Sequence, residues 1–224
     1  MKRVALTING QKVQAAVGRK LLWVALENSI YIPNLCAIEN AGQPAASCRL
    51  CWVEIEGYPA PVSACTVDVG EGMVVSTRGE GAVALARSGF NLIMSCHPVD
   101  CKVCPANGNC ELQKIARYLK ASLKQKQYPK IERGLPIDDS SPHFVYNPNK
   151  CVLCGKCVAA CRESGHQPIF GFVRRGFNRT VGAFAGEPFG ETWCDGCGAC
   201  VEACPAGALS LKKKRENQFK PGKF

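Results

Sequence analysis

The chain lacks the features that would carry it across or into a membrane. No run of apolar residues approaches the roughly 20 residues that cross a bilayer. The start, Met1-Lys2-Arg3, leads into a short apolar stretch that ends at Asn9-Gly10, which is too short and too polar for a signal peptide. We therefore expect a cytoplasmic protein with reduced thiols and no membrane partner.

The chain also lacks a dinucleotide-binding fingerprint. No G-x-G-x-x-G follows a predicted strand, so nothing in the sequence indicates that this chain binds NAD or flavin itself. No set of residues indicates a general acid, a general base or a nucleophile. We therefore predict no catalytic residue.

Cysteine, by contrast, is far above ordinary usage, with 16 residues in a chain of 224. Disulfide frameworks of this density belong to small secreted domains, and nothing in this sequence looks secreted. The cysteines are therefore predicted to bind metal.

Two cysteine runs dominate the second half of the chain. Cys151 to Cys161 and Cys194 to Cys204 both read C-x2-C-x2-C-x3-C. In bacterial two-cluster ferredoxins, the first three cysteines of such a run bind one [4Fe–4S] cluster and the fourth binds the other. The spacing therefore predicts two clusters with these ligands: Cys151, Cys154, Cys157 and Cys204 on one, and Cys194, Cys197, Cys200 and Cys161 on the other.

Zinc is the alternative metal for paired cysteines. A zinc site has no use for a third evenly spaced cysteine, so the two complete runs favour iron–sulfur clusters. One departure from the ferredoxin pattern is that Arg162, and not proline, follows Cys161. This substitution affects the expected turn but leaves the number of ligands unchanged.

The beginning of the chain predicts a small sheet packed on one helix. Residues 4–8 and 12–16 alternate in polarity around Asn9-Gly10, which is a strong hairpin signal, and residues 20–28 have helical periodicity. Strand-like stretches follow at 52–56 and 73–77. This order suggests a β-grasp fold.

Four cysteines in this region have the ligand order of plant-type [2Fe–2S] ferredoxins, a CxxC pair flanked by single cysteines. Eleven residues separate the first two, where plant-type ferredoxins have four. The alternative is that these thiols are merely buried in a small core. We favour a [2Fe–2S] cluster because the CxxC pair lies in a loop; the predicted ligands are Cys36, Cys48, Cys51 and Cys65.

A helix over 79–95 is predicted to lead to a further group of ligands. A second helix follows Asn109, its expected N-cap, with Cys110 in its first turn and an apolar stripe that reaches Leu123. Between these helices, spacing alone makes Cys96, Cys101, Cys104 and Cys110 a sufficient ligand set. His97 adjoins Cys96, and imidazole can replace thiolate at a cluster, but spacing favours Cys96.

A resemblance to a known family changes this assignment. His97-x3-Cys101-x2-Cys104-x5-Cys110, followed by Glu111-Leu112-Gln113, resembles the one-histidine, three-cysteine [4Fe–4S] signature. This signature occurs in the large iron–sulfur subunit of complex I, in [FeFe] hydrogenases and in the diaphorase gamma subunit of NAD-reducing [NiFe] hydrogenases. The resemblance implies that His97 is the ligand and that Cys96 is a small buried residue.

The resemblance covers nearly the whole chain and implies an α+β protein with one [2Fe–2S] and three [4Fe–4S] clusters. Its parts would be a β-grasp [2Fe–2S] ferredoxin-like domain (1–78), a small helical domain with the histidine-ligated cluster (79–120) and, after a proline-containing linker (121–140), a two-[4Fe–4S] bacterial-ferredoxin-like domain (141–214). A polar, basic tail (215–224) follows. We expect a short hairpin between the two cysteine runs, and we expect His143 and His166 to be structural, His143 facing solvent.

Because the sequence ends about 20 residues after Cys204, the resemblance favours the stand-alone gamma subunit. It implies a relay of single electrons between a hydrogenase module and a flavin module that reduces NAD⁺. The implied partners are a flavin- and NAD-binding diaphorase subunit and the small and large [NiFe] hydrogenase subunits. An equivalent relay in a formate dehydrogenase, a bifurcating complex or a complex I-type assembly has the same motifs.

The formal charge of +10 would ordinarily suggest nucleic acid or an acidic partner. Four clusters with their thiolates would add about −7 and leave about +3, so the basic balance is mostly internal compensation. A zinc-binding nucleic-acid module is the less favoured alternative. The basic run at 212–215 is interpreted as a solvated tail.

Overall fold

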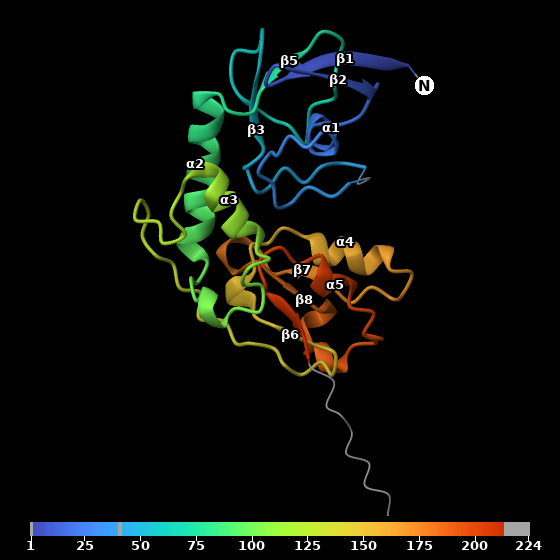
Figure 1. Ribbon diagram of the computed structural model, residues 1–224. Helices are drawn as coiled ribbons and strands as arrows, with labels where there is room; N and C mark the ends of the chain where they lie inside the picture. The colour runs from blue at the N-terminus through green and yellow to red at the C-terminus, as the bar shows by residue number, and fades with distance from the viewer. Residues whose placement is uncertain (1, 40–41, 213–224) are drawn as a thin grey trace, which may run out of the picture.

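The computed structural model describes residues 2–39 and 42–212. Three parts follow one another along the chain: a sheet with one helix, a pair of helices, and a part built from short strands and helices (Figure 1). The basic tail predicted at 215–224 lies outside the described residues.

The first part is a five-stranded sheet in the order β2-β1-β5-β3-β4, with β1 parallel to β5 and the other pairs antiparallel. The predicted hairpin is confirmed: β1 and β2 pair from Arg3↔Ala16 to Ile8↔Gln11, and Asn9 and Gly10 both have positive φ, as a type I′ turn requires. The elements are β1 (Arg3–Ile8), β2 (Gln11–Ala16), α1 (Leu21–Glu27), β3 (Trp52–Ile55), β4 (Val62–Ser63) and β5 (Val74–Ser76).

The core of this part lies between the sheet and α1. Alternate residues of β1 point inward, and Val4, Leu6 and Ile8 are buried, as strand periodicity requires. Leu22 and Val24 of α1 pack against them. The β-grasp arrangement therefore follows from one apolar face of the sheet and one apolar face of the helix.

The second part consists of α2 (Glu80–Cys96), the short 3₁₀ turn η1 (Cys101–Val103) and α3 (Glu111–Leu119). The helix predicted over 79–95 is confirmed. The start predicted for α3 needs correction: the N-cap is Cys110, so Cys110 precedes the helix, and Asn109 does not cap it. The helix stops at Leu119 because Lys120 adopts a left-handed conformation (φ 49°), so Leu123 lies beyond its end.

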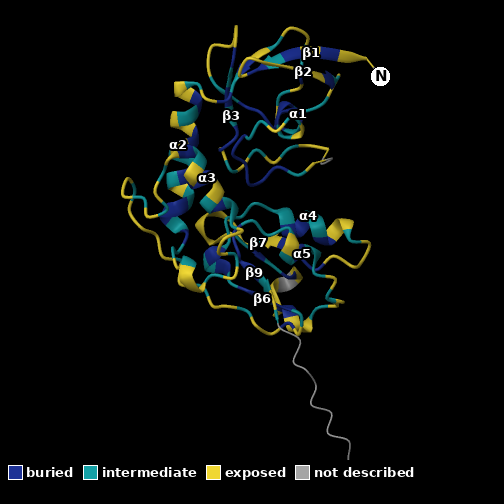
Figure 2. Cartoon of the chain, viewed as in Figure 1, coloured by how far each residue is buried: buried dark blue, intermediate teal, exposed yellow. Residues whose placement is uncertain are grey.

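A central apolar cluster joins the three parts. Phe90 of α2 and Ile115 of α3 are fully buried in it. Leu35 and Leu50 enter from the first part and Ala206 enters from the third. Figure 2 shows the buried residues on the inner sides of these helices, with the exposed residues outside.

The third part is organised by two cysteine runs, each of which leads into a helix through a left-handed glycine, Gly155 (φ 79°) or Gly198 (φ 80°). The first helix continues to Glu163, whereas the second ends before Pro205, which cannot continue a helix. The predicted hairpin is confirmed as β7 and β8. The elements are β6 (Phe144–Tyr146), η2 (Pro148–Lys150), α4 (Lys156–Glu163), β7 (Gly171–Val173), η3 (Gly176–Asn178), β8 (Thr180–Gly182), η4 (Phe184–Gly186), η5 (Phe189–Glu191), α5 (Ala199–Glu202) and β9 (Leu209–Leu211).

Strands β6 and β9 close this part as an antiparallel pair, Phe144↔Leu211 to Tyr146↔Leu209. Beneath them lies an aromatic core in which the rings of Phe170 and Phe189 are 4.8 Å apart. Among the residues that the structure describes, no helix is long and apolar enough to cross a bilayer.

Candidate iron–sulfur cluster sites

The four cysteines of the first part converge. Cys36, in the loop after α1, accepts a hydrogen bond from the main-chain N–H of Cys48 at 3.4 Å. Its thiolate is also stabilised by the Cys48 thiol, which lowers the pKa of Cys36 to about 5. Cys51 and Cys65 form a second pair of neighbouring free thiols, in which the Cys51 thiol stabilises the Cys65 thiolate and lowers the pKa of Cys65. The charges of Cys36 and Cys48 also act on Cys65, so the two pairs adjoin.

Cys51 and Cys65 also belong to the apolar core, as the buried-core alternative expects. Burial alone does not explain why four thiols meet, since buried thiolates repel one another. The CxxC loop holds its shape through Arg49, which has φ 55°, and through a 2.9 Å hydrogen bond from Trp52 Nε1 to the Arg49 carbonyl. A preformed loop of this kind is suited to a polynuclear metal centre.

The two cysteine runs interlock in the third part. One small cavity is lined by the first three cysteines of the first run together with the last of the second, and another by the converse set. This is the reciprocal grouping that the spacing predicts. The two sets are Cys151, Cys154, Cys157 and Cys204, and Cys161, Cys194, Cys197 and Cys200.

Left-handed residues at equivalent places shape both runs. Leu153 (φ 54°) corresponds to Gly196 (φ 79°), each two residues after the first cysteine of its run. The main-chain N–H of Leu153 lies 3.4 Å from Cys151 Sγ, and that of Ile169 lies 3.4 Å from Cys161 Sγ. These N–H groups are the donors that a buried thiolate needs.

Burial dominates the electrostatics of these thiols. It raises the pKa of Cys154 and of Cys200 to about 12. These thiols therefore keep their protons at neutral pH until a cation displaces them, which is the usual coupling between metal binding and thiol ionisation.

The middle part brings Cys101, Cys104 and Cys110 close enough that the charges of the first two raise the pKa of the third, after burial, which is the larger cause. His97 caps the C-terminal end of α2 and is only 8% exposed. Its Nδ1 is the one buried side-chain nitrogen or oxygen without a hydrogen-bond partner in the part of the chain that the structure describes.

The state of His97 suits a ligand. Burial, and then the charges of Lys130 and Lys150, lower its pKa to about 4, so the ring is neutral at pH 7. A buried, neutral, unpartnered imidazole nitrogen is an unusual cost in a folded protein, and coordination of iron would remove it. The residues present therefore fit a cluster.

Cys96 differs from the buried residue that the resemblance implies. It is half-buried, and its Sγ lies 3.6 Å from Ser95 Oγ. The expectation for His143 also needs correction, because it is half-buried against Gly196 and lines the Cys161 cavity. His166 is exposed and its Nδ1 lies 2.7 Å from Asp195 Oδ2.

Within residues 2–39 and 42–212, no group of three Cys, His, Asp or Glu side chains is spaced to hold a single metal ion. The ligands of a cluster bind separate iron atoms and stand further apart.

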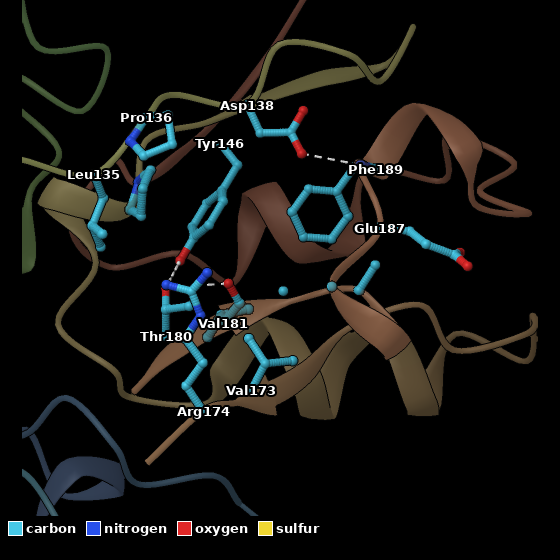
Figure 3. A pocket seen from close by; sticks show the side chains of 14 residues that line it. Leu135, Pro136, Asp138, Tyr146, Val173, Arg174, Thr180, Val181, Glu187 and Phe189 are labelled. Carbon is cyan, nitrogen blue, oxygen red and sulfur yellow. Dashed lines mark hydrogen bonds between the residues drawn. The ribbon is translucent and has the colours of Figure 1, made fainter. Parts of the chain in front are cut away.

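A cleft of about 670 Å³ adjoins the Cys151 site. Tyr146 and Val181 line both the cleft and the cysteine cavity, so they form the wall between the two. Figure 3 shows Tyr146 directed at Thr180, whose hydroxyl is 3.2 Å from the Tyr146 hydroxyl, and Asp138 directed at the N–H of Phe189, at 3.0 Å.

Sequence reasoning missed Lys150, the one buried lysine among the described residues. Lys102 and Lys156 also adjoin predicted ligands, but Lys102 is exposed and Lys156 is half-buried. The position of Lys150 directly before Cys151 was a signal, but its burial depends on the packing of the third part against the second.

Family models match four segments of the chain. They describe a 2Fe-2S iron-sulfur cluster binding domain (1–80), the NADH-ubiquinone oxidoreductase-G iron-sulfur binding region (87–122) and two 4Fe-4S binding domains (143–166 and 188–210). The 2Fe-2S match thus lies at the start of the chain, and the two 4Fe-4S binding domain matches lie in its second half.

Curated relatives match over nearly all of this chain. NADPH-Fe(3+) oxidoreductase subunit alpha of Geobacter sulfurreducens is 36% identical over 93% of this chain and 24% of its own length. NADP-reducing hydrogenase subunit HndD of Solidesulfovibrio fructosivorans is 32% identical over 93% and 36%. The mitochondrial NADH-ubiquinone oxidoreductase 78 kDa subunit of Neurospora crassa is 28% identical over 93% and 28%. The chain thus spans about a quarter to a third of these relatives.

A solved structure extends the likeness to the fold. A chain of the NAD+-reducing [NiFe]-hydrogenase in the H2-reduced state superposes with a TM-score of 0.84 and 27% identity, covering 94% of this chain and 88% of that one. Over nearly its whole length the chain is thus similar to iron–sulfur subunits of NAD-reducing hydrogenase and of NADH dehydrogenase.

Proposed function

We propose that this chain relays single electrons through four iron–sulfur clusters between a hydrogenase module and a flavin module that reduces NAD⁺. The observation that carries the proposal is the reciprocal grouping of the two cysteine runs around two cavities, with two further ligand groups in the same chain. The likeness to a hydrogenase chain over its whole fold supports the choice of complex.

The proposed ligands assign fifteen cysteines and one histidine. Cys96 is left unassigned. The [2Fe–2S] cluster takes Cys36, Cys48, Cys51 and Cys65, and the three [4Fe–4S] clusters take His97, Cys101, Cys104 and Cys110; Cys151, Cys154, Cys157 and Cys204; and Cys161, Cys194, Cys197 and Cys200.

Bound clusters supply reversible one-electron storage. The chain's own residues hold the sites in one rigid framework, exclude water and donate N–H groups to sulfur, as Leu153 and Ile169 do. Ligand type, burial and such hydrogen bonds adjust the potential of each site. No residue of this chain acts as an acid, a base or a nucleophile in the proposal.

The proposed partners are a flavin- and NAD-binding diaphorase subunit and the small and large [NiFe] hydrogenase subunits, in the cytoplasm. Electrons from hydrogen oxidation would enter from a hydrogenase cluster and leave toward flavin, or flow in reverse. A second candidate is the same relay in a complex I-type, bifurcating or formate dehydrogenase assembly. The likeness to the NADH-ubiquinone oxidoreductase 78 kDa subunit favours the complex I-type assembly among these three.

Anaerobic affinity purification from the native host separates these candidates. Co-purification of [NiFe] hydrogenase subunits with hydrogen-dependent NAD⁺ reduction supports the first proposal. Co-purification of other oxidoreductase subunits, without hydrogenase, supports the second. A colourless chain that carries zinc would overturn both.

A further inference from the structure

Lys150 is buried at the junction between the second and third parts. It ends η2 and is 5% exposed. Its Nζ lies 2.9 Å from Asp100 Oδ2, in the segment between His97 and Cys101. The side chain of Asp100 is itself 43% exposed, so water weakens its attraction for the lysine.

The same lysine touches two of the proposed cluster sites. Its ammonium is near enough to Cys104 and to the His97 ring to interact with both electrostatically. The residue that follows it, Cys151, belongs to the other cavity. The two sites are also packed together directly, because an added Cβ on Gly207 would lie 2.8 Å from Ala106 Cβ and 3.2 Å from Cys104 Sγ.

A buried ammonium is retained only where negative charge compensates its lost hydration. Asp100 supplies one partly hydrated charge. Cys104 lies nearby, and its sulfur would supply a second negative charge as a thiolate bound to a cluster. The environment of Lys150 therefore favours a thiolate-ligated centre beside it.

We propose that Lys150 is a fixed cation that raises the reduction potential of the histidine-site cluster, bound by His97, Cys101, Cys104 and Cys110, above the value its ligands alone would give. The inference rests on the proposed function and extends it to a residue that adjusts the potential of one cluster without binding that cluster. Hydrogen bonds to the sulfurs and nearby charge set cluster potentials, and a cation stabilises the reduced, more negative state.

The redox balance is simple. A cluster held by His97, Cys101, Cys104 and Cys110 would gain one electron from a neighbouring centre and pass one electron on, so the net charge of the site would fall by one and then be restored. No bond at Lys150 or at Cys104 forms or breaks.

The test uses the full chain purified anaerobically in its complex. The replacements are Lys150→Met, which keeps the bulk of the stem but no charge, and Lys150→Arg, which keeps the charge. Redox titration followed by EPR measures the potential of each cluster. Lys102→Met is the matched control, because Lys102 also adjoins a ligand, Cys101, but is exposed.

Lys150→Met is expected to reduce the equilibrium constant for one-electron reduction of the histidine site at least tenfold, which lowers its potential by about 59 mV. Lys150→Arg and Lys102→Met should each change the constant less than threefold. A Lys150→Met protein with a full set of clusters and an unchanged potential overturns the inference.

If Lys150→Met fails to assemble the cluster, Lys150→Gln is titrated in its place, since it keeps a hydrogen-bond donor without the charge. An unchanged potential in Lys150→Gln would likewise overturn the inference. Failure of the proposed function is distinguishable, because the unaltered chain would then lack this cluster altogether.

Discussion

At the C-terminal end of α2, Cys96 and His97 are adjacent but have different environments. His97 buries an unpartnered ring nitrogen, whereas Cys96 is half-buried and contacts a serine hydroxyl. Iron is the partner that would satisfy this nitrogen, whereas Cys96 Sγ already has Ser95 Oγ at 3.6 Å.

The first prediction concerns this pair. His97→Ala is expected to remove one [4Fe–4S] cluster, about four iron atoms per chain, while Cys96→Ala keeps the full content. His97→Cys should retain the cluster with a lower potential, because histidine ligation raises potential. Iron analysis and EPR of the anaerobic variants check this. Loss of the cluster in Cys96→Ala with retention in His97→Ala would reverse the assignment.

The second prediction concerns Tyr146, which is 4% exposed, hydrogen-bonds to Thr180 and lines the same cavity as Cys151. Tyr146→Phe removes a hydroxyl dipole beside the Cys151 ligand set and should lower the potential of that cluster. It should also reduce the free energy of unfolding by about 1 kcal/mol. Redox titration and chemical denaturation measure these effects.

The matched control is Tyr58→Phe, since Tyr58 is exposed on the first part. It should change neither quantity. An unaltered Cys151 potential in Tyr146→Phe would mean that this hydroxyl does not reach the bound thiolate.

At the scale of elements, α2 approaches the CxxC loop of the first part closely at Gly89. A Cβ at this position would lie 2.6 Å from the carbonyl oxygen of Arg49, a main-chain atom that cannot rotate away. Gly89 therefore permits the helix and the cluster loop to pack in contact.

The third prediction follows from this contact. Gly89→Ala would ordinarily stabilise a helix by about 1 kcal/mol, but here it should shift the loop and weaken retention of the [2Fe–2S] cluster. The rate of [2Fe–2S] loss in air, followed by absorbance, should increase. Leu85→Ala on the exposed side of α2 is the control. Equal rates in both variants would contradict the role given to Gly89.

Much of the element structure could be predicted because its signals are local. The hairpin around Asn9-Gly10, the helix over 79–95 and the hairpin between the cysteine runs depend on turn residues and periodicity. The start of α3 could not, since Asn109 is a better N-cap by composition than Cys110. The N–H of Glu111 instead bonds the carbonyl of Pro205, from the third part.

Of the sites, the reciprocal cysteine grouping was predictable from spacing alone, because the fourth ligand lies on the turn after each run. The burial of Lys150 and of His143 was not, since both depend on contacts between distant segments. Nor did residue type foretell that Leu153 occupies a left-handed position where the second run has glycine.

At the scale of the whole molecule, the three parts share one core. Phe90 of α2 contributes to the cluster that Leu35, Leu50 and Ala206 enter from either side. Tyr31 of the first part also donates to Glu111 Oε1 of α3, at 2.8 Å. The proposed cluster sites are therefore fixed relative to one another by packing.

The fourth prediction tests whether the three parts share this core. Phe90→Ala should lower the free energy of unfolding by about 3–5 kcal/mol and should destabilise all three parts together. Leu92→Ala, on the exposed side of the same helix, should cost less than about 0.5 kcal/mol. Hydrogen exchange of the anaerobic protein would show which parts of the chain Phe90→Ala destabilises. Faster exchange confined to α2 and α3 would argue against a shared core.

The most direct test of the electron-relay account is the iron, sulfide and EPR analysis of the full chain, purified without exposure to air. The account predicts about 14 iron atoms and an equal number of sulfides per chain, and EPR signals from one [2Fe–2S] and three [4Fe–4S] clusters on stepwise reduction. A chain that contains zinc in place of iron and shows no reducible centre would contradict it.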